Sequence, residues 1–509
     1  MKIRTISLSF LALCMTFFSG NVMAARAASL TLIASGLDQP RGFNFAPDGT
    51  LYIPEPGVGG NTDRCQPSPS TLFQPICAGN SSKITAISPN GNKRTLLNGF
   101  SSLAEQPSKN QGAGLADIDF DAAGNAYIIS GFAGYPGNRD EEISILAQDF
   151  PVPDGQKATF PPSPIEDVLA TPDLAKLFKI DLETEEYTEI FDFGLFEVTR
   201  NPDKGDYVTN PYDLDIANGK AYVVDGGGNA TYEIDLASGE GKATPLPRLI
   251  VENPEFPPQN PPEELEPEVN PLGNGEVIGE AIDGNPPVPG GGPGTPPDGA
   301  PPTGAPPEGG EDPGDLLPGL FEPVPGNPNA ISIQSVPTGN AIGPDGAVYV
   351  GEYTGFPYPE GQARIFKLKE DGTPEVYAEG FTQITDIEFD ADGNLLVLEF
   401  SDEAPWKGED IRSLPSSLTS ISPDGKKTVL VAPGEGLESA DGITIGPDGG
   451  IFVANRAIGG GEGQIVRLDL AGDVGGKGPK SVPEPGSILG LMLAGVGGIS
   501  VLKKKQQQL

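Results

Sequence analysis

One pattern occurs six times in the chain and constrains its fold more than any other feature. Each copy has an alternating apolar strand, a turn that ends in Gly, and a second strand of the form x-Tyr-Val-x-acid. The copies span residues 41–55, 116–130, 212–225, 338–352, 385–399 and 441–455. Period-two alternation on both sides of a tight Asp-Gly turn is typical of a β-hairpin. We therefore expect six antiparallel hairpins of one kind.

Further strands follow the hairpins. A third strand is expected at residues 83–91, 176–186, 230–239, 364–372, 417–425 and 464–472, and a fourth follows most of these. Four antiparallel strands repeated in series are typical of propeller blades. The sixth copy stops after its third strand, whereas Ser29–Leu37 resembles a fourth strand without the other three. We expect the N-terminal strand to complete the last blade and close the ring, which removes free sheet edges. The predicted fold is an all-β, six-bladed propeller over residues 29–480.

One insertion between the third and fourth blades has a different composition. Residues 252–329 are rich in Pro, Gly and Glu, and no Lys or Arg occurs between Arg248 and Arg364. Such a stretch buries too little apolar surface to offset its ordering entropy, so we expect disorder. Two roles are open for this insertion: a solvated spacer or a weak cation-binding tract.

Both ends of the chain carry export signals. Residues 1–28 combine basic Lys2 and Arg4, an apolar run and small-residue cleavage sites, the pattern of a signal peptide. At the other end, residues 482–509 contain Val-Pro-Glu-Pro, an uncharged stretch over 486–502 and three lysines. That end resembles the PEP-CTERM sorting segment, which implies processing by an exosortase-type enzyme and a transient inner-membrane stage. The alternative is an ordinary tail anchor with the same short transmembrane helix and topology.

Charge and cysteine content restrict the partners and the compartment. A net charge of −39 with no histidine disfavours nucleic acid and anionic lipid, whose recognition depends on Lys and Arg. Cations and neutral ligands are the expected partners. Once the signal peptide is removed, Cys65 and Cys77 are the remaining cysteines. An even pair in an exported chain predicts a disulfide.

Several strings give the chain a family resemblance. They lie at residues 55–61, 210–229, 336–359 and 441–455, within copies that resemble NHL and SMP-30-like propellers. The strings resemble the ScyD/ScyE family, which implies an exported protein associated with the assembly of the pigment scytonemin. A pigment precursor or an envelope polymer is therefore an expected partner, at the periplasm, the outer surface or outside the cell. The resemblance leaves the reaction open.

Oxygen-bearing side chains repeat at the end of the second strand of the copies. Glu55, Glu352, Glu399 and Asn455 are the candidate metal ligands, and oxygen donors in this number suit Ca²⁺. For the three glutamates a structural role within the blade is an equally open alternative. A second repeated position, near the start of the first strand, holds Asp117, Asp213 and Asp386. For these aspartates we favour hydrogen bonds to the backbone of the neighbouring blade.

Other residues are candidates for ligand binding, and the set is Arg41, Asp225, Asn229, Tyr353 and Asp441. Arg41 suits an anionic group, with a surface or inter-blade ion pair as the favoured alternative. Asp225 to Asn229 form a glycine-rich loop that suits a metal or phosphate, with a plain turn as the alternative. Tyr353 lies in the most specific of the family-like strings. Trp406, the only tryptophan, suits stacking on an aromatic ligand or packing in a loop.

Two enzyme classes share the predicted architecture. Gluconolactonase-like propellers use a Glu, an Asn and an Asp around calcium, and Asp441 matches that Asp, but Arg41 stands where an amide is expected. Propellers that use a histidine base are excluded, because the chain has no histidine. The chain also has no haem, nicotinamide or nucleotide motif. We expect a binding or scaffold protein, with a calcium-dependent lactone or ester hydrolase and a matrix protein as alternatives.

Overall fold

The computed structural model describes residues 28–60, 63–68, 71, 74–150, 164, 167–257, 321–408 and 410–470. The predicted signal peptide, apart from Ala28, most of the predicted disordered insertion and the whole sorting segment lie outside these residues. Within the described part of the chain, no helix is long and apolar enough to span a bilayer.

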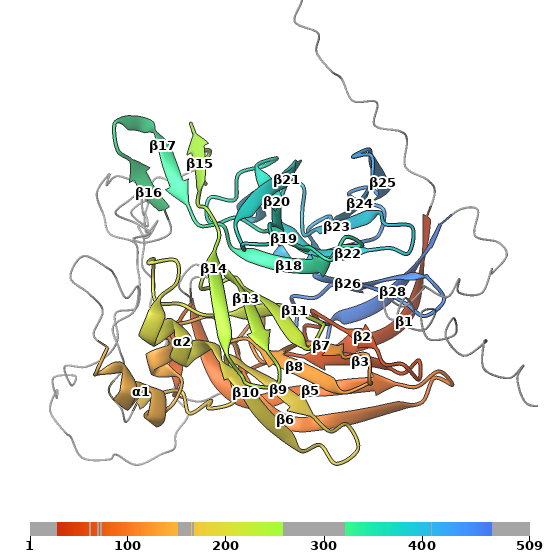
Figure 1. Ribbon diagram of the computed structural model, residues 1–509, viewed down its shortest axis with the longest axis horizontal. Helices are drawn as coiled ribbons and strands as arrows, with labels where there is room; N and C mark the ends of the chain where they lie inside the picture. The colour runs from red at the N-terminus through yellow and green to blue at the C-terminus, as the bar shows by residue number, and fades with distance from the viewer. Residues whose placement is uncertain are drawn as a thin grey trace, which may run out of the picture. The chain divides into compact units, whose positions relative to one another are not determined.

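Six antiparallel sheets repeat one strand order along the described chain, and each begins with a predicted hairpin (Figure 1). The first contains β2 (Asn44–Phe45), β3 (Leu51–Glu55), β5 (Pro75–Ile87), β6 (Lys93–Glu105) and the short β4 (Cys65–Pro67). The second contains β7 (Leu115–Phe120), β8 (Ala126–Ser130), β9 (Lys176–Ile180) and β10 (Tyr187–Asp192). The third contains β11 (Pro211–Ala217), β12 (Lys220–Asp225), β13 (Ala230–Asp235) and β14 (Gly241–Pro245).

The remaining three repeats follow the same order. The fourth sheet contains β18 (Pro337–Ile342), β19 (Val348–Glu352), β20 (Ala363–Leu368) and β21 (Pro374–Phe381). The fifth contains β22 (Ile384–Phe389), β23 (Leu395–Glu399), β24 (Ser417–Ile421) and β25 (Lys427–Val431). The sixth contains β26 (Gly442–Ile445), β27 (Ile451–Asn455), β28 (Gly463–Leu470) and β1 (Ala28–Leu37). The prediction of a mostly β chain built from repeated hairpins is confirmed.

Strand β1 lies beside β28, from the opposite end of the described chain (Figure 1). The pairing is antiparallel and runs from Ala28 opposite Leu470 to Leu37 opposite Gly463. The N-terminal strand therefore supplies the outer strand that the sixth repeat lacks, as the sequence predicts.

The hairpin turns explain why the repeat folds as it does. In the first copy, the Gly49 amide donates to Ala46 O at 2.8 Å, and Gly49 has φ +82°. Gly393 has φ +80° at the same place in the fifth copy. A side chain is disfavoured in this left-handed region, so glycine ends the turn. Alternating side chains of the flanking strands then pack between sheets, for example Ile118, Ile128 and Leu177, all fully buried.

The first strands of successive sheets are joined by hydrogen bonds. Asp117 Oδ2 accepts from the Leu214 amide at 2.9 Å, and Asp213 Oδ2 accepts from the Asn340 amide at 2.6 Å. Asp386 Oδ2 accepts from the Ile443 amide at 2.7 Å. The predicted structural role of these three aspartates is thereby confirmed.

A three-stranded sheet corrects the predicted extent of the disordered insertion. Strand β15 (Leu249–Glu252) pairs with β17 (Asn327–Ile333), which also pairs with β16 (Phe321–Val324). Residues 321–329 are therefore ordered strand and turn, contrary to the prediction for 252–329. The cause is the apolar alternation at Ile331 and Ile333, which lets β17 bury one face.

Short helices, which the strand repeat does not predict, lie in the connections. Helix α1 (Glu141–Ala147) begins at Asp140, whose side chain accepts from the Ile143 amide. Helix α2 (Phe193–Arg200) begins in the same way at Asp192. These N-caps satisfy amides that have no partner inside the helix. The 3-10 turns are η2 (Pro136–Asn138), η4 (Pro405–Lys407) and η5 (Ile411–Ser413).

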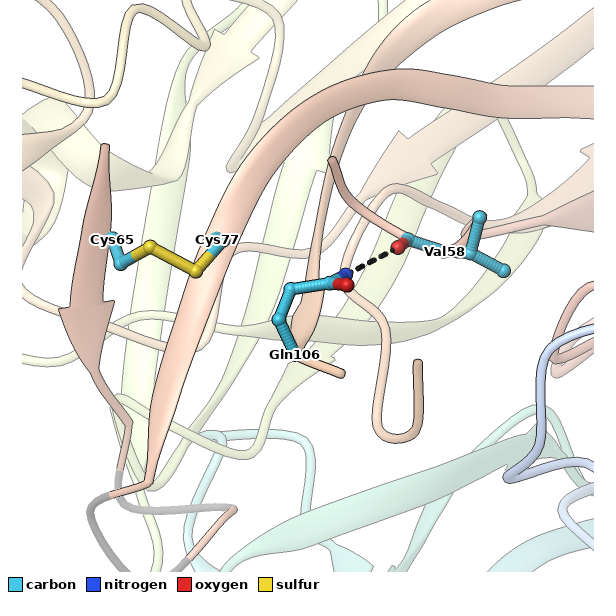
Figure 2. Close-up of a disulfide and its surroundings, with 4 residues drawn as sticks. All are labelled: Val58, Cys65, Cys77 and Gln106. Carbon is cyan, nitrogen blue, oxygen red and sulfur yellow. Dashed lines mark hydrogen bonds between the residues drawn. A yellow bond between two sulfur atoms is a disulfide. The ribbon is translucent and has the colours of Figure 1, made fainter. Parts of the chain in front are cut away.

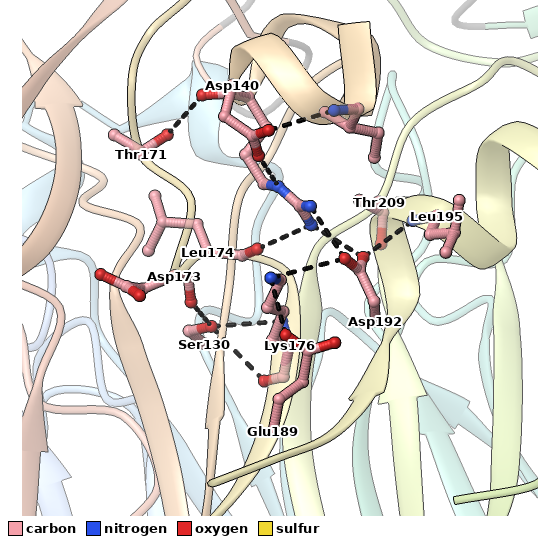
Figure 3. A network of polar contacts seen from close by, with 12 residues as sticks. Ser130, Asp140, Thr171, Asp173, Leu174, Lys176, Glu189, Asp192, Leu195 and Thr209 are labelled. Atoms are coloured by element: carbon pink, nitrogen blue, oxygen red, sulfur yellow. Dashed lines mark hydrogen bonds and ion pairs between the residues drawn. The ribbon is translucent and has the colours of Figure 1, made fainter. Parts of the chain in front are cut away.

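One buried arginine ties the two helices to the second sheet. Arg139 forms an ion pair with Asp140 at 2.7 Å and binds both carboxylate oxygens of Asp192, at 2.7 and 2.8 Å. Lys176 on β9 adds ion pairs to Glu189 at 2.8 Å and to Asp192 at 3.6 Å (Figure 3). The same carboxylates thus cap the helices and neutralise the buried cations.

The predicted disulfide is confirmed. Cys65 on β4 is bonded to Cys77 on β5, 12 residues later in the sequence, and the two are register partners (Figure 2). Nearby, the Gln106 side-chain amide donates to Val58 O at 2.9 Å. The disulfide fastens the short β4 to the extended hairpin of β5 and β6.

Candidate functional site

In three sheets, the residue at the end of the second strand fastens the sheet to the loop before it. Glu55 accepts from the Asp38 amide at 2.7 Å, and Glu399 accepts from the Thr382 amide at 2.6 Å. Asn455 Oδ1 accepts from the Glu438 amide at 2.7 Å. Each donor precedes its acceptor by 17 residues, so these three contacts are one repeated structural device.

Two of these carboxylates also have a cation beside them. Lys83 lies 3.1 Å from Glu55. Arg364 lies 2.5 Å from Glu352, which also accepts from the Ser335 hydroxyl at 2.6 Å. Hydrogen bonds and ion pairs within each sheet therefore occupy the oxygens that the sequence assigns to calcium.

The structure does not bring the predicted calcium ligands together. Glu55, Glu352, Glu399 and Asn455 belong to four different sheets, and each contacts its own sheet and loop. Within the described ranges, no group of three or more Asp, Glu, Cys or His side chains is placed to hold a metal ion. Each of these four side chains thus bonds within its own part of the fold.

The glycine-rich loop at Asp225 to Asn229 is closed by its own hydrogen bonds. Asp225 Oδ1 accepts from the amides of Asn210, Gly227 and Gly228 at 2.6–2.9 Å. Asn229 donates to Asp203 at 3.0 Å and accepts from the Val336 amide at 3.1 Å. The amides that would bind a phosphate at Gly227 and Gly228 are occupied. Asp225 and Asn229, which the sequence analysis assigns to ligand binding, do not line the cavity described next.

A cavity of about 330 Å³ lies where the loops of several sheets meet. Its floor comes from one repeated position, the residue before the Gly or Asp that recurs near the start of each first strand. Five of the six such residues line it: Arg41, Tyr212, Thr338, Thr385 and Asp441. The volume is at the small end of the range for ligand sites.

Aromatic rings form the wall of the cavity: Tyr353, Phe356, Tyr358, Phe400 and Trp406. The Tyr353 ring centroid lies 5.9 Å from those of both Tyr358 and Phe400. The Trp406 indole N–H donates to Pro357 O at 2.9 Å and so joins the two loops that carry the rings. Burial raises the pKa of Tyr358 to about 12, so its phenol stays neutral at physiological pH.

The wall loop has a fixed backbone because it pairs with the chain before β18. The amides of Tyr353, Thr354 and Gly355 donate to Val336, Ser335 and Gln334 carbonyls at 2.8–3.0 Å. The rings are therefore held in place by main-chain contacts before any ligand arrives, which lowers the entropic cost of binding.

Three residues of the floor interact closely with one another. The Tyr212 hydroxyl donates to Asp441 Oδ1 at 2.6 Å, and the Arg41 guanidinium lies 4.7 Å from the centre of the Tyr212 ring. Arg41 Nε is 3.5 Å from Asp441 Oδ2. Burial raises the pKa of Asp441, while Arg41 and the Tyr212 hydroxyl oppose that shift. Burial, and next the Asp441 carboxylate, raise the pKa of Tyr212 well above its usual value.

Some residues of the predicted binding set line this cavity and others do not. Arg41, Tyr353 and Asp441 from the predicted binding set line the cavity, and so does Trp406. Tyr212, Phe356 and Phe400, which also line the cavity, were not predicted. The available signal for Tyr212 was its register, since it aligns with Arg41 and Asp441 in the repeat.

Comparisons with known proteins show a similarity in backbone fold alone. No protein-family model and no curated protein matches the chain. Among solved structures, a streptogramin B lyase is 11% identical with a TM-score of 0.36, over 87% of this chain and 98% of that one. The calcium-binding protein regucalcin from Agrobacterium tumefaciens is 10% identical with a TM-score of 0.39, over 88% and 96%. A gluconolactonase from Xanthomonas campestris is 9% identical with a TM-score of 0.39, over 89% and 93%.

Proposed function

We propose that this chain is an exported six-bladed propeller that binds a small aromatic molecule in the cavity lined by Tyr353 and Trp406. The observation that carries the proposal is the cavity wall, where five aromatic side chains converge from two loops above a polar floor. Apolar walls with a few fixed polar groups are characteristic of small-molecule sites.

Contacts between the first strands support the closed propeller. Hydrogen bonds link neighbouring sheets in chain order, and the Thr338 hydroxyl donates to Ile384 O at 2.5 Å between the fourth and fifth sheets. The Gly42 amide donates to Ala116 O at 3.0 Å between the first and second. Between the sixth and the first, the Thr444 hydroxyl donates to Asn44 Oδ1 at 3.3 Å. A series of neighbours that returns to its start is what a ring of blades requires.

Export and processing are part of the proposal and rest on the sequence alone. The signal peptide directs the chain out of the cytoplasm, and the sorting segment holds it at the inner membrane until an exosortase-type enzyme acts. A Glu484→Ala change in the Val-Pro-Glu-Pro motif is expected to keep the protein in the membrane fraction of its native host. Normal release of that variant would contradict the sorting role.

The aromatic wall suits one of the partner classes expected from the family resemblance, a pigment precursor, better than an envelope polymer. A polymer needs an open groove along its length, whereas this cavity holds about 330 Å³. Binding rather than hydrolysis is the favoured role, because Tyr212 and the nearby Arg41 guanidinium oppose the rise in the pKa of Asp441, which makes this floor carboxylate a weaker general base.

The single tryptophan provides the test. Because Trp406 lines the cavity and is the only tryptophan in the chain, its fluorescence reports on the site directly. Naphthalene-sized probes are expected to change that emission in a saturable way, and Trp406→Phe is expected to remove the signal while calorimetry still detects binding. If neither method detects binding, the proposal is wrong. Turnover of an aryl ester or lactone would instead favour the hydrolase.

A further inference from the structure

We propose that the cavity floor selects a neutral aromatic ligand that carries a hydroxyl group, a phenol by chemical class. This inference rests on the proposed aromatic-binding function and specifies which aromatic molecules the site prefers. It follows from the hydrogen-bonding state of three buried side chains that line the cavity.

Arg41 has donors with no hydrogen-bond partner. Its side chain is largely buried, and its Nη2 donates to Gly112 O at 2.8 Å. Its Nε and Nη1 atoms are buried and make no hydrogen bond among the described residues. Buried donors without partners are rare in folded proteins, because each costs about 1–3 kcal/mol. Arg41 therefore has hydrogen-bonding capacity left for a ligand acceptor.

Asp441 has the complementary feature, an acceptor oxygen with no hydrogen-bond partner among the described residues. It is 2% exposed, and Tyr212 occupies its Oδ1. Its Oδ2 lies 3.5 Å from Arg41 Nε but accepts no hydrogen bond within the described chain. Two residues that line the cavity thus hold an open donor set and an open acceptor next to each other.

The charge of this pair restricts the group that fits it. Arg41 and Asp441 together are neutral, so a carboxylate on the ligand would approach the Asp441 carboxylate, and an ammonium would approach the Arg41 guanidinium. A hydroxyl donates one hydrogen bond and accepts others. It can therefore donate to Asp441 Oδ2 and accept from Arg41 Nη1 without bringing a charge into the cavity.

Thr354 adds a third polar group to the cavity lining. It is 1% exposed, and its hydroxyl makes no hydrogen bond within the described residues. Its φ of +73° is unusual for a β-branched residue, and its amide is held by Ser335 O at 3.0 Å. Backbone strain of this kind is concentrated at ligand sites. A second oxygen on the ligand would find a donor here.

The test compares ligands that share a ring system and differ in one group: naphthalene, 2-naphthol, 2-naphthoate and 2-naphthylmethylammonium, titrated by calorimetry into the mature protein. Hydrogen bonds to charged groups contribute about 1.5–3 kcal/mol, so 2-naphthol should bind roughly 10- to 100-fold more tightly than naphthalene. It should also bind more tightly than either charged analogue.

Variants then locate the effect. Asp441→Asn should bring the affinity for 2-naphthol close to that of the same variant for naphthalene. Asp386→Asn is the matched control, because Asp386 is a buried aspartate of the same ring of strands that does not line the cavity.

Each outcome has a distinct meaning. Equal affinities for naphthalene and 2-naphthol in the wild-type protein would overturn the hydroxyl preference and leave the aromatic site standing. Tightest binding of 2-naphthoate would also overturn it and make the floor an anion site. If none of the four probes binds, the proposed function itself fails.

Discussion

The Tyr212 hydroxyl donates a 2.6 Å hydrogen bond to Asp441, 229 residues away in the sequence. One residue begins the third sheet and the other precedes the sixth, so the bond crosses the floor of the cavity. It fixes one oxygen of the carboxylate and leaves the other facing Arg41. The floor is thus held by contacts between repeats that are distant in the chain.

Removal of this bond should destabilise the protein. In Tyr212→Phe the buried Asp441 loses the partner of Oδ1, and an unsatisfied buried acceptor costs about 1–3 kcal/mol. Urea unfolding of the variant should show a loss of that size, and Tyr377→Phe, at a partly exposed tyrosine outside the cavity, should show almost none. Equal stability of the two variants would mean that the bond does not form.

The strand-end carboxylates should matter for folding without calcium. Glu352→Gln removes the charge that pairs with Arg364 on β20, and breaking a largely buried ion pair costs about 3–5 kcal/mol. The melting temperature should fall in excess EDTA, and calcium should not restore it. A wild-type protein that calcium stabilises strongly, and a variant that loses this effect, would instead favour the calcium role predicted from the sequence.

The network around Arg139 should anchor both helices. Arg139→Met leaves Asp140 and Asp192 without their buried cation, with an expected loss of about 3–5 kcal/mol. Arg412→Met is the control, because the ion pairs of Arg412 are far more exposed. Hydrogen exchange should speed up in α1 and α2 in the first variant alone. Unchanged protection there would contradict the anchoring role.

Acidic side chains along the first strands should make stability depend on pH. Burial raises the pKa of Asp119 to about 7, of Asp213 to about 6 and of Glu388 to about 8, with neighbouring carboxylates adding to the shift for Glu388. In the unfolded chain these groups titrate near pH 4. At pH values between the unfolded and the folded pKa, the folded state therefore binds more protons than the unfolded state does. Their stabilising contribution is complete below about pH 4 and is lost as the pH rises to about 8.

The urea midpoint should therefore be higher at about pH 5 than at about pH 8, and Glu388→Gln should reduce the difference. Glu370→Gln, at an exposed glutamate, should leave it unchanged. A midpoint that rises with pH over this range would contradict the pKa shifts.

The strands could be predicted because local chemistry determines them. Turn glycines such as Gly49 and the alternation beside them define each hairpin, and the lone strand at Ser29–Leu37 indicates the pairing with β28. The site was harder to predict, because Tyr212, Arg41 and Asp441 share a register position but no side-chain chemistry. Phe356 and Phe400 lie on loops, where no periodicity distinguishes a cavity lining from a packed turn.

The predicted calcium ligands show that a polar residue repeated in the sequence need not mark a ligand site. Glu55 and Glu399 each accept from a loop amide 17 residues earlier, as Asn455 does in the sixth sheet, so this position recurs for a structural contact. A repeated polar residue in a repeated fold can serve the repeat itself, and the sequence alone does not tell where its oxygens point.

The most direct test of the aromatic site is the affinity of 2-naphthol for two matched tyrosine variants. Tyr353→Leu removes a ring of the cavity wall, whereas Tyr377→Leu removes a ring on β21, outside the cavity. We expect the first to weaken binding about 10-fold, since aromatic contacts contribute about 0.5–1.5 kcal/mol beyond the area they bury. The second should bind like the wild-type protein. Equal affinity of both variants and the wild type would contradict the account, because it would place the ligand outside this cavity.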